Sequence, residues 1–235
     1  MCGRFTLTQE GEVLLERFRL QALPPEYRPR YNIAPGQPAL SIGLRAGERR
    51  ASMLRWGLIP HWAKDPKMGY SLINARAESV REKPSFRVPF ERRRCLIPAD
   101  GFYEWRKEGR RRIPFRFVLK KRVPFAFAGL WDAWRPPGEP QSEPLYTFTI
   151  LTTAANELVA RVHDRMPVIL AEEEAWDLWL DPEVPGEGVA HLLESFPADA
   201  MEAYEVSPVV NSARNDTPEC IVPAAAGEAG DLEQT

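Results

Sequence analysis

Cysteine and long apolar runs are both scarce in this 235-residue sequence. The three cysteines, Cys2, Cys95 and Cys220, are too few and too widely spaced for a disulfide framework. No uncharged apolar run is long enough to cross a bilayer, and Arg4 and Glu10 interrupt the apolar stretch that a signal peptide requires. We therefore expect a cytoplasmic protein without a membrane partner, in which a reducing environment keeps Cys2 a free thiol.

Lysine is rare as well, with 6 Lys against 25 Arg, and the charge is unevenly distributed. Residues 1–122 hold 27 of the 31 Lys and Arg and 12 of the 33 Asp and Glu, a net charge of +15. Residues 123–235 hold the other 4 Lys and Arg and the other 21 Asp and Glu, a net charge of −17. This asymmetry indicates a polyanionic partner, and the planar guanidinium suits phosphates and bases. Because a GC-rich genome also enriches arginine, composition alone leaves phosphate binding open.

The spacing of apolar residues predicts strands and helices along the whole chain, with no internal repeat and no dividing linker. We expect strands at 39–45, 50–57, 94–98, 101–106, 112–119, 124–131, 145–152, 166–170 and 203–206. We expect helices at 8–20 (capped by Thr8), 155–161, 172–180 and 187–195, and only short helices in 78–92, interrupted by Pro84 and Pro89. Residues 1–223 are thus predicted to form a single α+β domain with a curled, largely antiparallel, barrel-like β-sheet and peripheral helices, followed by a disordered tail at 224–235.

Cys2 is the first residue that points to chemistry. Methionine aminopeptidases remove Met1 when the second residue is small, and Cys2 then carries an α-amine and a thiol on adjacent carbons. The α-amine has a pKa of about 7.7–8.0, so roughly a tenth is neutral at pH 7, and such amines form Schiff bases with carbonyls. The thiol can then close a five-membered thiazolidine ring, which resists hydrolysis. From its position alone, Cys2 can equally be an accident of the N-terminus.

Arg4 and Asn74 lie in two segments that could face a substrate. Residues 3–5 have a strand-like pattern that would pin the N-terminus into the sheet, where Arg4 could hold a phosphate near the amine or remain solvated. Asn74 lies between an apolar run and a helix start, so it could orient the amine or a sugar hydroxyl, and Arg76 could bind phosphate. Helix capping by Asn74 explains the same pattern equally well.

Glu104 lies in the strand-like segment Gly101-Phe102-Tyr103-Glu104-Trp105. In a strand, Phe102 and Glu104 share one face, and Tyr103 and Trp105 share the other. An inward carboxylate would have a raised pKa and could serve as general acid and base, and Trp105 offers a stacking surface for a base. The alternative is an exposed Glu104 that pairs with an arginine on a neighbouring strand.

His163 and Arg165 lie in the segment His163-Asp164-Arg165-Met166-Pro167, between a predicted helix and a predicted strand. Loops at such positions often carry catalytic residues, and histidine titrates near neutral pH. Arg165 is a further candidate for phosphate binding. A buried structural histidine explains His163 about equally well.

Nine short motifs that include these residues occur in order along the chain. They are Met-Cys-Gly-Arg (1–4), Tyr-Asn-Ile-Ala-Pro (31–35), Arg-Trp-Gly-Leu-Ile-Pro (55–60), Asn-Ala-Arg-Ala-Glu (74–78), Arg-Cys-Leu-Ile-Pro-Ala-Asp-Gly-Phe-Tyr-Glu-Trp (94–105), Ala-Gly-Leu-Trp (128–131), Phe-Thr-Ile-Leu-Thr (148–152), His-Asp-Arg-Met-Pro (163–167) and Asn-Asp-Thr-Pro-Glu-Cys (215–220). Together they resemble the SRAP family, the SOS-response-associated peptidases, also called abasic site processing proteins. The resemblance runs from residue 1 to about residue 223 and leaves out the loop at 135–144.

The resemblance implies an enzyme of the DNA damage response that binds abasic sites in single-stranded DNA and crosslinks to them through Cys2 by the thiazolidine route. Carried over to this chain, Cys2 is the nucleophile and Asn74 orients the terminus and the open sugar. Glu104 moves protons during opening and closure of the sugar ring, and His163 assists the Schiff-base chemistry.

The resemblance also implies a set of DNA contacts. Arg4, Arg76 and Arg165 would bind phosphates that flank the lesion, with Thr152 close by. Pro35, Trp62 and Trp105 would stack on bases or wedge between them. We expect no cofactor and no metal, the family suggests a monomer, and a bacterial source would place the protein at the nucleoid.

Three other functions compete with this one. An N-terminal-nucleophile amidohydrolase or peptidase would use Cys2 to attack an amide, but it does not explain the arginine excess. A passive single-stranded DNA-binding module would leave Cys2 incidental. A metal site built from Cys2, Cys95, Cys220 and His163 fits no compact zinc spacing. The family name implies a peptidase, yet with only Met1 ahead of Cys2, ordinary aminopeptidase removal suffices.

Overall fold

The computed structural model describes residues 2–224, so the predicted tail at 224–235 lies outside the described residues except for Ala224. The strands are β1 (Phe5–Leu7), β2 (Arg30–Ile33), β3 (Pro38–Arg45), β4 (Glu48–Trp56), β5 (Asn74–Arg76), β6 (Arg94–Ala99), β7 (Gly101–Glu108), β8 (Arg111–Leu119), β9 (Phe125–Trp134), β10 (Leu145–Ala154), β11 (Arg165–Pro167), β12 (Ile169–Leu170) and β13 (Met201–Glu205). The α-helices are α1 (Gly11–Phe18), α2 (Pro84–Arg92), α3 (Glu157–Ala160) and α4 (Glu173–Leu180). The short 3-10 helices are η1 (Pro66–Ser71), η2 (Ala77–Ser79), η3 (Ala190–Leu193), η4 (Ala198–Ala200), η5 (Pro208–Asn211) and η6 (Pro218–Ile221).

The strands form two sheets. One sheet has the order β13-β8-β7-β1-β2, and its pairings are antiparallel. In the larger sheet, β10 pairs with β4 on one side and with β9 on the other, so β10, β4, β3, β6 and β9 close into a ring. The predicted α+β domain with a curled, largely antiparallel sheet is confirmed, with β10 parallel to β4 and β5 as the exception.

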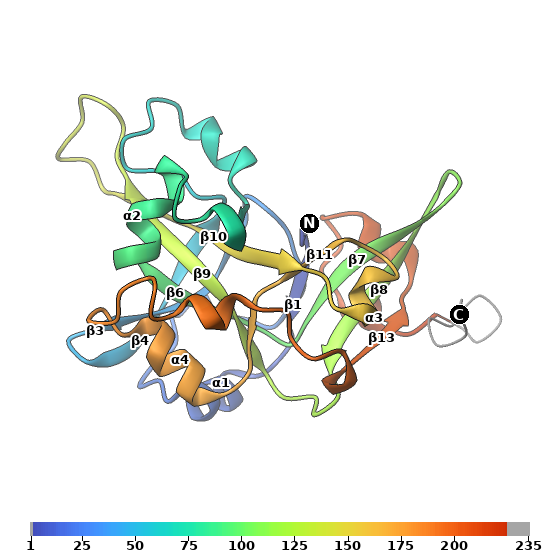
Figure 1. Cartoon of the computed structure of the whole chain (residues 1–235). Coiled ribbons are helices and arrows are strands. Elements are labelled where there is room, and N and C mark those ends of the chain that lie inside the picture. The colour runs from blue at the N-terminus through green and yellow to red at the C-terminus, as the bar shows by residue number, and fades with distance from the viewer. Residues whose placement is uncertain (1, 225–235) are drawn as a thin grey trace.

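The N-terminal strand β1 joins the two sheets. Figure 1 shows it in the middle of the molecule, between the ring-like sheet and the pair β7 and β8. The Phe5 ring packs edge-on against Trp56 of β4 and Phe127 of β9, with centroids 5.2 and 5.6 Å apart. Because these aromatic rings are fully buried or nearly so, β1 has little freedom to leave the sheet, and the predicted pinning of the N-terminus is confirmed.

The predicted hairpin at 39–57 is also confirmed. β3 and β4 pair in continuous register, and the turn between them places Ala46 and Gly47 at φ of 52° and 78°. Two consecutive residues with positive φ give a turn whose twist matches that of the flanking strands, which is why such turns favour glycine.

Three local predictions are wrong. Thr8 does not cap α1, which begins only at Gly11, because its backbone N and Oγ1 both donate to Asp100 at 2.6 Å. Pro89 does not break 78–92, because α2 runs through it, and Pro84 stands at the helix start, where a missing N–H costs nothing. The helix predicted at 187–195 is only the 3-10 turn η3, which has no side-chain cap. Within residues 2–224, no helix is long and apolar enough to cross a membrane.

Candidate active site

Cys2 lies just ahead of β1, and its side chain has no exposed surface. Phe5 pairs with Ile33 of β2 and with Phe102 of β7, which fixes the backbone immediately after Cys2. The Asn74 side chain donates from Nδ2 to the Cys2 carbonyl oxygen at 2.8 Å. Two residues that are 72 positions apart in the sequence therefore meet here.

Asn74 is positioned by β5, a short strand that pairs in parallel with β10, where Asn74 lies opposite Ile150. The alternative of helix capping is wrong, because the cap position of the following turn is Arg76, which makes no side-chain cap. The Oδ1 atom of Asn74 is buried and accepts no hydrogen bond from any residue between 2 and 224. An amide oxygen of this kind beside Cys2 is an acceptor for an amine or a hydroxyl group.

Glu104 lies on β7 with only 4% of its surface exposed, so the alternative of an exposed Glu104 is wrong. The predicted alternation holds, since Phe102 is part of the main core and Tyr103 packs with Trp105 in a separate cluster. Burial, with a smaller contribution from the charge of Asp164, raises the pKa of Glu104 to about 7. A carboxyl group with this pKa can both give and take a proton near neutral pH.

The Cys2 thiol is influenced by the same carboxylate. Burial raises the pKa of the thiol well above its ordinary range, and the negative charge of Glu104 adds to that rise. The two side chains are therefore close enough to interact electrostatically. The thiol is in its protonated form at neutral pH, so it needs a base before it can act as a nucleophile.

His163 follows α3 and is partly exposed, with 30% of its side chain accessible. Its Nδ1 accepts from the backbone N of Arg165 at 3.0 Å and lies 2.9 Å from Asp164 Oδ1. Burial lowers the pKa of His163, which favours the neutral ring at pH 7. When Nδ1 is the acceptor, the proton of the neutral ring is on Nε2.

The Arg4 guanidinium is bound within the protein. It donates to Asn32 Oδ1 and to the Val210 carbonyl oxygen, each at 2.9 Å, and lies 5.7 Å from the centre of the Trp105 ring. Trp105 in turn donates from Nε1 to Asn211 Oδ1 at 2.6 Å. These contacts fix Arg4 and Trp105 together beside the turn η5.

Arg165 is also held by other residues. It pairs with both carboxylate oxygens of Glu78 and donates to the Thr152 carbonyl oxygen at 2.6 Å. Thr152 is fully buried and lies opposite the exposed Arg76 in the β5–β10 pairing. Arg165 and Arg76 therefore lie on the two strands that flank the same end of β10.

The remaining predicted DNA contacts lie on loops. Pro35 follows β2 and is partly exposed. Trp62 is 48% exposed, and the preceding residue is anchored because the His61 backbone N donates to Asp132 Oδ2 at 3.0 Å. Among residues 2–224, Trp105 packs against Tyr103, and Trp62 makes no aromatic ring contact with it.

Three polar residues that support the site received no role from the sequence. Glu78 holds Arg165, and Asn32 holds Arg4 while donating to three carbonyl oxygens of the segment 210–215. Asp216 accepts from the backbone N of Tyr31 and of Asn32, at 2.7 and 2.9 Å. Each of the three lies inside a motif quoted above, and this was the only feature of the sequence that could have pointed to a role for them.

The three cysteines are buried and free. In the part of the chain that the structure describes, no group of three or more His, Cys, Asp or Glu side chains is arranged to hold a metal ion.

Comparison with known proteins places this geometry in a family. Residues 1–213 match the family model described as SOS response associated peptidase (SRAP). The abasic site processing protein YoqW of Bacillus subtilis is 50% identical over 225 residues, which cover 94% of this chain and 99% of the relative. The abasic site processing protein HMCES of Gallus gallus is 37% identical over 240 residues, which cover 89% of this chain and 70% of the relative.

A solved structure has the same fold. The crystal structure of a protein from Bacteroides thetaiotaomicron superposes with a TM-score of 0.81 at 27% identity, covering 95% of this chain and all of the other. The match of the family model to most of the chain and the identity to these relatives agree. The chain therefore belongs to the SOS response associated peptidase (SRAP) family.

Proposed function

We propose that this protein binds abasic sites in single-stranded DNA and forms a covalent thiazolidine crosslink to them through Cys2, once Met1 has been removed. The crosslink would shield the lesion during the DNA damage response. The observation that carries the proposal is the grouping of a residue with two nucleophiles, Cys2, an orienting amide, Asn74, and a carboxyl group of pKa about 7, Glu104. The names of the relatives, which are abasic site processing proteins, support the choice of lesion.

The reaction begins at the amine of Cys2. An abasic sugar in its open form carries an aldehyde, and the neutral amine adds to the aldehyde carbon. The adduct loses one water to give a Schiff base. The sulfur then bonds to the same carbon, the C=N bond becomes a single bond, and the thiol proton ends on nitrogen. The net change is the loss of one water, and no oxidant or reductant is needed.

Glu104 moves the protons in these steps. Its pKa of about 7 means that both protonation states are populated near neutral pH. The protonated form can donate to the sugar oxygen during ring opening, and the ionised form can take the proton of the buried Cys2 thiol. Because burial keeps that thiol protonated, the amine reacts first and the sulfur closes the ring.

Asn74 orients the reacting groups, and His163 assists the Schiff-base steps. The bond from Asn74 to the Cys2 carbonyl oxygen fixes the terminal residue, and the Asn74 Oδ1 atom can accept from the amine or from a sugar hydroxyl. His163, neutral at pH 7, assists formation and hydrolysis of the Schiff base from the α3–β11 loop.

The DNA strand would lie across the arginines and aromatic residues around the site. Arg76 is exposed and free to contact a phosphate directly, whereas the contacts of Arg4 and Arg165 within the protein pre-organise their guanidinium groups for flanking phosphates. Thr152 positions Arg165. Pro35, Trp62 and Trp105 then provide apolar surfaces for the bases.

The proposal is tested by incubation with an abasic single-stranded oligonucleotide, followed by a denaturing gel. Wild-type protein should give a shifted band, and intact DNA of the same sequence should give none. Cys2→Ala, or a retained extension ahead of Cys2, should abolish the band. A band that survives both changes contradicts the mechanism.

The description of the family as peptidases favours a second candidate, in which the Cys2 sulfur attacks an amide. In this candidate the thiolate must make the first attack, and burial raises the pKa of the Cys2 thiol, so a base would have to take its proton before any bond forms. Accumulation of an acylated protein with small amides or peptides, measured by intact mass, would support this candidate.

A further inference from the structure

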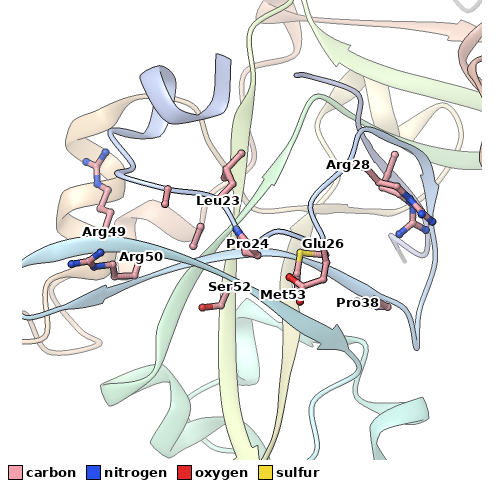
Figure 2. Close-up of a pocket in the computed structure, with 12 residues that line it drawn as sticks. Leu23, Pro24, Glu26, Arg28, Pro38, Arg49, Arg50, Ser52 and Met53 are labelled. Atoms are coloured by element: carbon pink, nitrogen blue, oxygen red, sulfur yellow. The ribbon is translucent and has the colours of Figure 1, made fainter. Parts of the chain in front are cut away.

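Two surface grooves lie apart from the candidate active site. The groove in Figure 2 has a volume of about 690 Å³ and lies between the α1–β2 loop and β4. Its arginines Arg30 and Arg49 are paired with acidic residues, while Arg28 has no hydrogen bond or ion pair recorded within residues 2–224. Arg50 lines both grooves and pairs with Glu48, so three of the four arginines that line the groove in Figure 2 are already neutralised.

The second groove, here called the β3–β10 groove, has a volume of about 650 Å³ and is lined by β3, β4, β9, β10 and the junction of α2 and β6. The side chains of its exposed cations Arg45 and Arg92 make no hydrogen bond or ion pair with other residues in 2–224. Arg50 pairs with Glu48. The acidic residue in the lining, Glu91, is partly satisfied because it accepts from the Gly186 backbone N at 2.8 Å. The groove is therefore basic.

An aromatic pair forms one side of the β3–β10 groove. Tyr146 is 47% exposed, and its ring lies 6.1 Å from that of Trp131 at an angle of 48°. The guanidinium of Arg93 lies 5.9 Å from the centre of the Trp131 ring, so a cation already covers part of that ring. The Tyr146 ring remains accessible to solvent. An exposed ring beside free arginines is the arrangement that stacks nucleobases.

The floor of the β3–β10 groove contains an unsatisfied polar atom. Ser41 is 2% exposed, and its Oγ has no hydrogen-bond partner among residues 2–224. A buried hydroxyl without a partner is unfavourable unless something else supplies the bond. Two residues further along the strand, a Cβ added at Gly43 would meet no atom within 4 Å. The groove thus combines open space at Gly43 with a buried hydroxyl group that has no hydrogen-bond partner among residues 2–224.

We propose that the β3–β10 groove binds one or two nucleotides of single-stranded DNA, with a base on Tyr146 and phosphates at Arg45 and Arg92. The choice of DNA as the polyanion rests on the proposed function. Tyr146 lies four residues before Ile150, the partner of Asn74, a separation of about 13 Å along β10. A strand held at Cys2 can therefore reach the groove within a few nucleotides.

The test is fluorescence anisotropy with an intact oligothymidine, so that no crosslink contributes to binding. Gly43→Leu fills the groove, Tyr146→Ala removes the stacking ring, and a double Arg45→Ala/Arg92→Ala variant removes the free cations. Each variant should weaken binding about fivefold or more, which is the size of effect expected for the loss of one stacked base. The slope of log affinity against log salt concentration, called the salt slope, should fall by about 1.4 in the double variant, because two phosphate contacts are lost. Arg28→Ala, in the groove of Figure 2, is the matched control and should change the affinity less than twofold.

A direct readout places the DNA. Photocrosslinking with an oligonucleotide that carries 5-iodouracil should label the peptide containing Tyr146 or Trp131, and Gly43→Leu should remove that label while circular dichroism shows an unchanged fold. Unchanged affinity and salt slope in all three groove variants, or labelling confined to other peptides, would overturn the proposal. Crosslinking to a short abasic oligonucleotide is measured in parallel, so a failure of the Cys2 chemistry is recognised separately from a failure of the groove.

Discussion

Replacement of Glu104 by glutamine should change how the stability of the protein depends on pH. Burial raises the pKa of Glu104 from its ordinary value of 4.5 to about 7 in the folded state. The folded state therefore binds a proton more tightly than the unfolded state. The resulting stabilisation is fully present below about pH 4.5 and is lost as the pH rises to about 7, where the folded state ionises as well.

The magnitude follows from the size of this rise. It corresponds to about 3 kcal/mol of unfolding free energy, at about 1.4 kcal/mol for each pH unit. Glu104→Gln keeps the size of the side chain and cannot ionise. We therefore expect the free energy of unfolding of the variant, relative to wild type, to increase by about 3 kcal/mol between pH 4 and pH 8.5.

Urea unfolding at several pH values measures this difference, since all other titrating groups are common to the two proteins. Glu108→Gln removes an exposed carboxylate from the same strand and controls for the loss of one negative charge. If the curves of wild type and Glu104→Gln stay parallel from pH 4 to pH 8.5, the burial of an ionisable Glu104 has been misjudged and its assignment as acid and base fails.

Three further outcomes are expected. Asn74→Ala should slow crosslinking about tenfold at unchanged affinity for intact DNA, measured by single-turnover gels, because it removes one hydrogen bond to Cys2; an unchanged rate would show that Asn74 does not orient the terminus. Arg76→Ala should weaken binding to single-stranded DNA and lower the salt slope by about 0.7, and an unchanged slope would exclude a phosphate contact. Phe5→Ala should lower the free energy of unfolding by about 3–5 kcal/mol in urea titrations, because the ring is fully buried between the two sheets; a loss below about 1 kcal/mol would contradict its role in joining them.

Local pattern was enough to predict part of the site. The alternation of β7 made it possible to predict that Glu104 shares one face of the strand with Phe102, and the short turn at Ala46 and Gly47 defined the β3–β4 hairpin. Both features depend on neighbours in the sequence. The period of two and the turn geometry are local properties, and a single sequence records them directly.

Long-range pairing was beyond the reach of the pattern. The contact between Asn74 and Cys2 depends on the parallel pairing of β5 with β10, which no residue near Asn74 specifies. Likewise, Arg4 was expected to face a phosphate, and its guanidinium is bound by Asn32 and by the distant segment at Val210. Such contacts follow from the closure of the whole sheet, so a motif can mark the residues without giving their partners.

Proline provides a third case. Pro89 was expected to end a helix, because it removes a backbone donor and its ring crowds the preceding turn. In the structure α2 continues to Arg92, with Phe86 and Phe90 buried on its inner face. Burial of these two rings outweighs the loss of one hydrogen bond, a balance that propensity alone cannot show.

The central claim is that the amine of Cys2 forms the first bond to the lesion and its thiol forms the lasting one. Intact-mass analysis of the product with an abasic oligonucleotide, followed by peptide mapping, tests this most directly. The predicted mass is that of the protein without Met1 plus the oligonucleotide less one water, with the link at Cys2 and no need for reduction. For Cys2→Ser, the predicted adduct survives only after treatment with borohydride. An adduct that retains Met1, or that maps to another residue, would contradict the claim.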